Sequence, residues 1–349
     1  MRNIGVNELS EIINVHSKSA VIERNGWKVV ISEKGARILG IFLNDLPNLL
    51  WVNPRIEEVL ERGEWNVGGH RIWISPERNF FYKDPENFVG WFCPEELDPG
   101  SYKIVEDEGD KVILDGEISV YDNVLKTSLE ASVRREIRLV EAGRKELKLR
   151  IREGIVGKYS ARVHPWALTQ VPISYGGVGT VLVSVKRNAE PIHYFGEIPK
   201  NRLRILRDHV AFKIDGNFVS KLGVRPEDLR EAGSGAIAYV SKVEKRTWSA
   251  VILRTHNLPL TQEDCLDIPK WNPDSPRGVI QSYNSGPEAF SDIKFGEIEL
   301  QLAPTINLSD RIFTTVEYDL IGFIGQRKEV LTRVRRTMKI KKPRIYAKS

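Results

Sequence analysis

Residues 145–152 read Lys-Glu-Leu-Lys-Leu-Arg-Ile-Arg, so that from Glu146 onward a leucine or isoleucine alternates strictly with a charged side chain. Successive side chains of a β-strand point to opposite faces of the sheet. The segment therefore predicts a strand of an antiparallel sheet that has one face on a hydrophobic core and the other in water.

Similar runs of β-forming residues lie on both sides of this segment. Three of them, at 20–23, 27–31 and 37–43, are short, and Asn25-Gly26 between the first two is a strong hairpin signal. Further strands are expected at 102–105, 111–115, 129–140, 160–170, 179–185, 203–206, 210–214, 236–243, 247–254, 279–283, 296–303 and 313–320. Helical candidates are few and short, at 6–13, 54–61 and 225–231, and residues 84–100 are typical of a long irregular loop. These patterns predict an all-β protein, a large sandwich or barrel of mainly antiparallel strands.

Composition sets the broad class of protein. No change of composition along the 349 residues indicates a linker, so we expect a single domain over residues 1–349. No apolar run is long enough for a membrane helix and no hydrophobic leader is evident, which favours a cytoplasmic protein without a membrane partner. Cys93 and Cys265 have no metal-ligand spacing and are expected to be free thiols, although a disulfide is the alternative. Two methionines and two cysteines beside 28% charged residues suggest a heat-adapted source.

The basic charge is concentrated at one end of the chain. Residues 327–349 carry ten Lys or Arg and one acid, so this tail contributes +9 to the net charge of +5 and the remaining residues sum to −4. A basic tail can bind phosphate, but a solvated end or an edge element is the commoner outcome. Since no RNA-binding motif or zinc finger accompanies it, no nucleic-acid partner is expected.

The segment Gly68–Arg78, with the sequence GGHRIWISPER, combines charged, polar and aromatic residues between a double glycine and a proline. In a strand, Arg71, Trp73 and Ser75 share one face while His70 lies on the other. A guanidinium group beside an indole ring suits a polyol that has one apolar face. The plain alternative is a solvated arginine and a core tryptophan at the end of a strand.

Two later segments carry groups for acid and base chemistry. Glu297, Glu299 and Gln301 share one face of a strand, which is either a solvent-facing edge or a set of groups directed at a ligand. In the second case, burial and like charge would raise one carboxyl pKa towards that of a useful base. On another strand His164 shares a face with Trp166. A lone histidine is more often structural, but together these strands would supply an acid and a base.

These residues resemble a known family. Gly68-Gly69-x-Arg71, His164-x-Trp166 and Glu299-x-Gln301-x-x-Pro304 are similar to motifs of the galactose mutarotase-like, or aldose 1-epimerase, superfamily. The likeness is greatest to its uncharacterised bacterial and archaeal branch, which carries Gly-Gly-x-Arg-x-Trp-x-x-Pro-Glu and Lys-x-Gly elements, here 68–77 and 221–223. The resemblance spans about residues 20–325, leaves 327–349 as a basic tail, and implies a β-supersandwich.

The resemblance also implies a mechanism. In the family a glutamate takes the proton of the anomeric hydroxyl and a histidine protonates the ring oxygen, so that the ring opens and closes to the other anomer. The matching catalytic residues are Glu299 and His164. The residues expected to hold the substrate are Arg71, His70, Trp73, Glu77, Trp166 and Gln301. No metal or other cofactor is implied, and the partner is a mono- or oligosaccharide, with an acidic or phosphorylated sugar compatible with the arginines.

Some features leave alternatives open. The Asn-Leu ending of the family's histidine motif is replaced by Ala167-Leu168, and the family's substrate-binding aspartate has only Asp264 or Asp267 as candidates. That acidic cluster could instead bind a divalent cation or face water. One alternative function is a non-catalytic carbohydrate-binding or regulatory protein on the same fold. Another is a glycoside-cleaving enzyme that uses Glu77 and Glu299 as its carboxyl pair.

Overall fold

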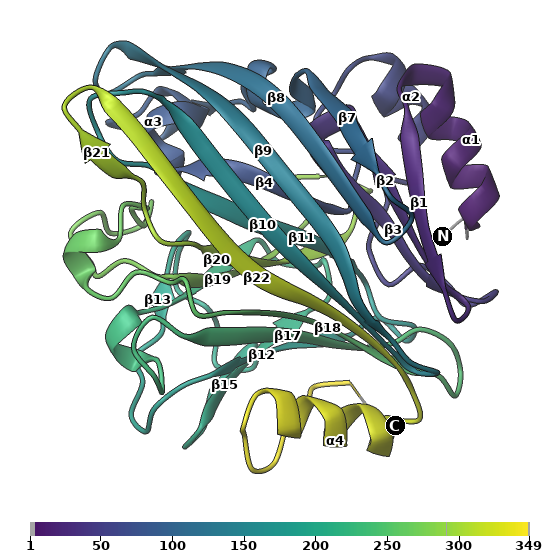
Figure 1. The fold of residues 1–349 in the computed structure, drawn as a ribbon. Coiled ribbons are helices and arrows are strands. Elements are labelled where there is room, and N and C mark those ends of the chain that lie inside the picture. The colour runs from purple at the N-terminus through teal and green to yellow at the C-terminus, as the bar shows by residue number, and fades with distance from the viewer. Residues whose placement is uncertain (1–3, 291, 348–349) are drawn as a thin grey trace.

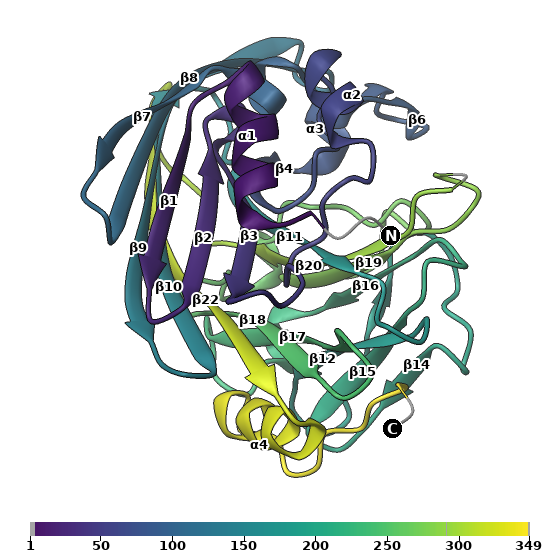
Figure 2. The ribbon, with the colours of Figure 1, turned by 90° about the vertical axis from the view of Figure 1, so that its right-hand side faces the viewer.

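Two large antiparallel sheets pack face to face (Figures 1 and 2). The computed structural model describes residues 4–290 and 292–347. The first sheet has nine strands in the order β1 (Ser19–Arg24), β2 (Trp27–Ser32), β3 (Arg37–Leu43), β4 (His70–Ser75), β11 (His164–Pro172), β20 (Phe295–Gln301), β19 (Ile280–Asn284), β16 (Ser220–Val224) and β13 (Ile192–His193). Four pairs of neighbours in this sheet, β4–β11, β11–β20, β19–β16 and β16–β13, join strands that do not follow each other in the chain, so the centre of the sheet forms through long-range pairing.

The second sheet has eleven strands. Their order is β14 (Leu203–Ile205), β15 (His209–Ile214), β12 (Gly179–Ser184), β17 (Gly235–Lys242), β18 (Trp248–Thr255), β22 (Arg311–Gly325), β10 (Glu146–Lys158), β9 (Thr127–Ala142), β8 (Lys111–Asp122) and β7 (Tyr102–Asp107), with β21 (Ile306–Leu308) paired to β22. A separate hairpin joins β5 (Tyr82–Asp84) to β6 (Val89–Trp91). The predicted β-rich architecture of mainly antiparallel strands is confirmed.

The alternating residues from Glu146 to Arg152 form a half-buried strand, as predicted. They lie in β10, where Leu147, Leu149 and Ile151 are buried while the charged residues between them are not. These side chains belong to a core that also contains Ile72 and Ile298 of the first sheet. The core therefore lies between the two sheets, and the hydrophobic effect on these inward faces holds the layers together.

Local signals set several connections. The predicted hairpin at Asn25-Gly26 joins β1 to β2, and both residues have positive φ, 53° and 81°, as a tight two-residue turn requires. The predicted helix at 225–231 is reduced to a single turn, Pro226–Asp228. Residues 84–100, predicted as irregular, include the β5–β6 hairpin and one further turn at Glu96–Gly100. Cys93 and Cys265 are free thiols.

In the part of the chain that the structure describes, four α-helices flank the sheets: α1 (Val6–His16), α2 (Ile56–Glu61), α3 (Glu77–Phe81) and α4 (Arg327–Thr337). The first half of the basic tail is α4, which packs against β18 and β22 (Figure 1). Val330 and Val334 on its inner side are fully buried against alanine and isoleucine side chains of the second sheet. Helix α4 therefore covers part of that sheet, and Arg333 on it pairs with Glu146 of β10. Among the described residues, no helix combines the length and apolarity needed to span a membrane.

Candidate functional site

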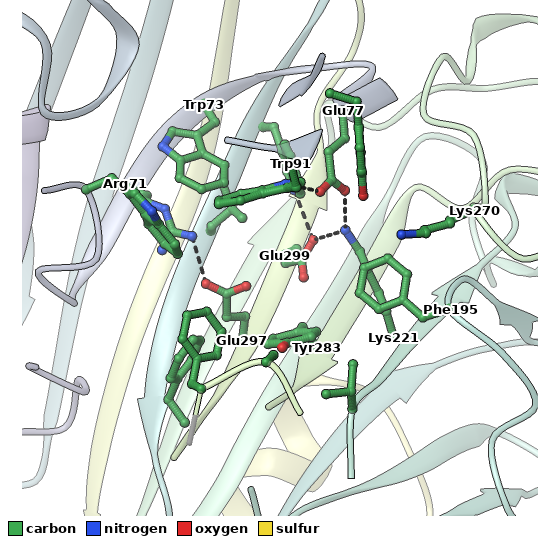
Figure 3. A pocket seen from close by; sticks show the side chains of 18 residues that line it. Arg71, Trp73, Glu77, Trp91, Phe195, Lys221, Lys270, Tyr283, Glu297 and Glu299 are labelled. Atoms are coloured by element: carbon green, nitrogen blue, oxygen red, sulfur yellow. Dashed lines mark hydrogen bonds and ion pairs between the residues drawn. The ribbon is translucent and has the colours of Figure 1, made fainter. Parts of the chain in front are cut away.

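A cavity of about 540 Å³ lies on the face of the nine-stranded sheet that points away from the second sheet (Figure 3). Its walls are mostly aromatic and come from Trp65, Trp73, Tyr82, Trp91, Trp166, Phe195, Tyr283, Phe290 and Phe295. Its charged groups are three cations and three carboxyl groups: Arg71, Lys221, Lys270, Glu77, Glu297 and Glu299. An aromatic cavity with a few converging charged groups is the usual form of a small-molecule site.

The register of the sheet explains why these residues meet. On β11, Leu168 lies directly opposite Arg71 of β4 on one side and Glu299 of β20 on the other. In the next row Tyr283 of β19 lies between Glu297 of β20 and Lys221 of β16. Because side chains alternate along each strand, all of these point to the same face.

The double glycine before β4 allows the chain to enter the sheet at this point. Gly68 has a φ of 113°, and a Cβ atom there would lie 2.4 Å from the carbonyl oxygen of Trp51. Any other residue would push the two segments apart, because real Cβ atoms do not approach a backbone oxygen so closely. The glycine therefore fixes the position of Arg71 and Trp73, which follow on β4.

Arg71 forms a buried ion pair at one end of the cavity. Its Nη2 donates to Oε1 of Glu297 at 2.8 Å, and its guanidinium carbon lies 4.1 Å from the centre of the Trp73 ring. Trp73 is fixed in turn, because its Nε1 donates to Asp98 at 2.7 Å. Two guanidinium nitrogens of Arg71, Nε and Nη1, have no hydrogen-bond partner among the described residues. Arg71 therefore keeps hydrogen-bond donors that no described residue satisfies.

Lys221 joins two carboxyl groups at the centre of the cavity (Figure 3). Its Nζ lies 3.3 Å from Oε2 of Glu299 and 3.5 Å from Oε2 of Glu77. It also lies 4.6 Å from the centre of the Trp166 ring. The lysine side chain is buried, so little water screens these interactions.

The surroundings of Glu299 differ strongly from those of a carboxyl group in water. It is completely buried and accepts a hydrogen bond from Nε1 of Trp166 at 3.1 Å, while its Oε1 has no partner among the described residues. Burial raises its pKa to about 7; Lys221 opposes this rise, and the charges of Glu297 and Glu77 add to it. A carboxyl group with this pKa exists in both protonation states near neutral pH and can act as a base or as an acid.

Glu77 is held in the cavity wall by two further contacts. Nε1 of Trp91 donates to its Oε1 at 2.9 Å, and its own backbone N–H donates to Oδ1 of Asp267 at 3.0 Å. Asp267 is buried and also accepts from the amide of Gln281 at 2.8 Å. Of the two aspartates noted in the sequence, Asp267 therefore supports the site from behind, whereas Asp264 pairs with Arg162.

Five of the eight predicted site residues line the cavity: Arg71, Trp73, Glu77, Trp166 and Glu299. His164 does not. Its Nδ1 bonds to the carbonyl oxygen of Leu302 at 2.6 Å and its Nε2 accepts from the backbone N–H of Leu266 at 3.0 Å. Burial lowers its pKa to about 4, so the ring is neutral at pH 7. Both nitrogens are occupied, which leaves the ring no proton to exchange with a ligand.

His70 and Gln301 also lie outside the cavity. The ring of His70 points between the sheets and bonds to Thr169 and to Tyr318 of the second sheet, each at 2.8 Å. Gln301 is buried and accepts from the hydroxyl group of Ser75 at 2.5 Å. For His70, strand alternation already places its side chain on the face opposite Arg71.

Sequence reasoning missed two central residues, Lys221 and Glu297, as members of the site. Glu297 is on the same strand face as Glu299, and Lys221 opens the Lys-x-Gly element at 221–223. The strand face of Glu297 and the Lys-x-Gly element of Lys221 can be recognised in the sequence, but nothing in the sequence shows which residues these two side chains contact. Among residues 4–290 and 292–347, no group of histidine, cysteine, aspartate and glutamate side chains has the arrangement of a metal site.

Comparison with known proteins identifies the family. A family model described as "Family of unknown function (DUF6786)" matches residues 48–160 and 166–341. The chain belongs to this family. The matched ranges of DUF6786 include all six charged residues of the cavity and run through α4. No curated protein sequence matches the chain.

Solved structures show the fold of this DUF6786 member. A candidate aldose 1-epimerase from Escherichia coli K12 is 11% identical, with 88% of this chain and 99% of that one covered and a TM-score of 0.53. Another from Klebsiella pneumoniae is 10% identical, with 93% and 83% covered and a TM-score of 0.51. A Synechocystis sp. PCC 6803 protein is also 10% identical, with 89% and 96% covered and a TM-score of 0.51. The chain has the galactose mutarotase-like fold that its sequence predicted.

Proposed function

We propose that this protein interconverts the anomers of an aldose, with Glu299 as the base. The observation that carries the proposal is the state of Glu299, a fully buried carboxyl group in an aromatic cavity whose pKa is raised to about 7. A base with this pKa can take the proton of the anomeric hydroxyl and return it in the same catalytic cycle. The fold, shared with candidate aldose 1-epimerases, is compatible with this activity.

The chemistry needs only proton transfer. Glu299 removes the anomeric proton, the bond between C1 and the ring oxygen breaks, and the ring oxygen takes up a proton. Rotation about the C1–C2 bond followed by the reverse steps gives the other anomer. His164 does not line the cavity, so the proposal differs from the predicted glutamate and histidine pair and requires another donor.

The substrate is proposed to be a sugar that lies against the aromatic walls. Its C–H faces would cover rings such as Trp166 and Trp91, and its hydroxyl groups would meet Arg71. Lys270 at the rim donates to the carbonyl oxygen of Phe88 at 3.1 Å and forms no ion pair with a described carboxylate. An acidic or phosphorylated sugar would find a partner there, so the panel of test sugars includes both neutral and anionic aldoses.

The test is the rate at which a freshly dissolved single anomer equilibrates, followed by polarimetry or NMR. The wild type is expected to accelerate equilibration of at least one aldose, and Glu299→Gln to slow it by about 100-fold or more, as loss of a general base does. Glu317→Gln is the matched control, because Glu317 pairs with Arg152 on the other sheet. Equal rates in the wild type and Glu299→Gln would overturn the assignment.

A glycoside-cleaving activity is a second candidate, because Glu77 and Glu299 both line the cavity. Such enzymes place a carboxyl group on each side of the bond that is cleaved. Here Nζ of Lys221 bridges the two groups, so a glycosidic bond would have to displace it. Release of reducing ends from an oligosaccharide by the wild type, and its loss in Glu77→Gln, would favour this candidate over anomer interconversion.

A non-catalytic carbohydrate-binding protein would need the aromatic walls and Arg71 but not the raised pKa of Glu299. In that case sugar binding, measured by calorimetry, would be lost in Trp166→Ala and retained in Glu299→Gln, and no sugar would equilibrate faster with the wild type.

A further inference from the structure

We propose that Lys221 is the acid of the reaction, giving a proton to the ring oxygen as Glu299 takes one from the anomeric hydroxyl. This inference rests on the proposed function and assigns its second proton transfer. The lysine would thus fill the role that the sequence resemblance gave to His164.

The other cations of the cavity are poor donors. Arg71 keeps its proton at any physiological pH, and Glu297 and Trp73 hold it at the end of the cavity. Lys270 is exposed at the rim and already donates to the carbonyl oxygen of Phe88. Lys221 is the buried lysine of the cavity and the one that contacts Glu299.

The tyrosines of the cavity and the two buried histidines of the nine-stranded sheet are less well placed to serve as the acid. Tyr82 and Tyr283 line the cavity, and burial raises the pKa of both phenols well above the ordinary value. In the described contacts neither hydroxyl group bonds to Glu299, whereas Lys221 forms an ion pair with it. His70 and His164 do not reach the cavity, because their rings bond to other parts of the core.

The distance between Lys221 and Glu299 matches the closeness of the two substrate oxygens that exchange protons. The anomeric hydroxyl oxygen and the ring oxygen are both bonded to C1, so the base and the acid that serve them must be neighbours. Nζ of Lys221 lies 3.3 Å from Oε2 of Glu299. The two groups can therefore contact these two oxygens together, the carboxylate at the hydroxyl and the ammonium at the ring oxygen.

The ion pair couples the two proton transfers. Burial lowers the pKa of Lys221, but the nearby carboxylates, of which Glu299 has the largest effect, outweigh it and raise that pKa above the ordinary value. When Glu299 accepts the anomeric proton, its charge disappears and the pKa of Lys221 falls. The ammonium group becomes a stronger acid at the moment when the ring oxygen gains electrons.

The step balances without any further reactant. The O–H bond at C1 breaks and its proton goes to Glu299, while its electrons form the carbonyl group. The C1–O bond of the ring breaks, and the ring oxygen keeps that electron pair and takes a proton from Lys221. A neutral carboxylic acid and a neutral amine remain, so the pair has the same net charge before and after. Ring closure reverses each transfer.

The decisive variant is Lys221→Arg, which keeps the positive charge and the partners of Lys221 but cannot release a proton. We expect kcat for anomer equilibration to fall by about 100-fold while the variant still binds sugar in calorimetry. Lys148→Arg is the matched control, since Lys148 pairs with Asp319 at 3.0 Å outside the cavity. A Lys221→Arg rate within a few-fold of the wild type overturns the inference.

A second measurement covers the case in which arginine does not fit. Lys221→Met should have little activity, and added methylamine should restore part of it in proportion to its concentration, which a purely structural lysine would not allow. No recovery in a Lys221→Met protein with a native circular dichroism spectrum counts against the inference. If Glu299→Gln is inactive and Lys221→Arg is not, only the role of Lys221 fails; if no aldose equilibrates faster with the wild type, the proposed function itself fails.

Discussion

Arg71 and Glu299 lie in one row across the nine-stranded sheet, each directly opposite Leu168 of β11. Arg71 nevertheless pairs with Glu297, two residues before Glu299 on the same strand. The two glutamates therefore have different surroundings. Glu297 holds the arginine in place, whereas burial and the ion pair with Lys221 set the pKa of Glu299. One strand face thus carries both the carboxylate that pairs with Arg71 and the carboxyl group that we propose as the base.

The pH dependence of the rate follows from the raised pKa of Glu299. Because the carboxylate form must act first, the rate of anomer equilibration is expected to rise as pH increases through about 7. Initial rates measured between about pH 5 and pH 9 test this. A rate that does not change across this range would show that Glu299 is not the titrating base.

The contribution of Glu299 to the free energy of unfolding falls as pH rises, whereas the rate is expected to increase. The folded protein holds the proton of Glu299 more tightly than the unfolded chain does, because its pKa is raised to about 7. The stabilisation is fully present below the ordinary carboxyl range and is lost as pH rises towards 7. Urea unfolding of Glu299→Gln should therefore lack this part of the pH dependence, which the wild type shows.

Removing Arg71 should affect both stability and binding. Arg71→Met leaves the carboxylate of Glu297 buried without its partner, which typically costs about 3–5 kcal/mol. Arg71→Met combined with Glu297→Met should recover most of the free energy of unfolding but not the sugar affinity. Urea unfolding and calorimetry measure the two effects separately. Full recovery of affinity in the double variant would contradict a binding role for Arg71.

His164 provides a direct comparison between the sequence resemblance and the structure. Its ring bonds to the backbone at Leu302 and Leu266, so His164→Ala leaves one buried and one part-buried backbone group without this partner and should lose about 1–3 kcal/mol of stability. The kcat of the folded variant should stay within a few-fold of the wild type. A stable variant with a 100-fold lower kcat would restore the predicted catalytic role.

Alternation predicted most of the fold and part of the site. It placed Arg71 with Trp73 and Glu297 with Glu299, because a strand offers only two faces. It also predicted that His164 shares the face of Trp166. It did not reveal where along the strand the cavity ends: His164 is the first residue of β11 and lies opposite Ser75, beyond the rows that line the cavity.

Contacts between distant strands could not be predicted in the same way. Lys221 and Glu299 are brought together by β19, which lies between their strands. No pattern within either strand's own sequence predicts that β19 is its neighbour in the sheet. The basic tail was ambiguous because its many charges mask Val330 and Val334, which are the residues buried in α4. The cytoplasmic location and the heat-adapted source remain predictions from composition.

The order of strands around the cavity determines when the site can form during folding. The cavity takes its floor from β4, β11, β20, β19 and β16, which span the chain from His70 to Gln301. Pairing of such distant segments is slow, because the chain must close long loops before the contacts form. A fragment that ends before β20 would therefore contain Arg71 and Lys221 but not Glu299, the proposed base. If the proposed activity is present, its appearance during refolding would report completion of the whole sheet.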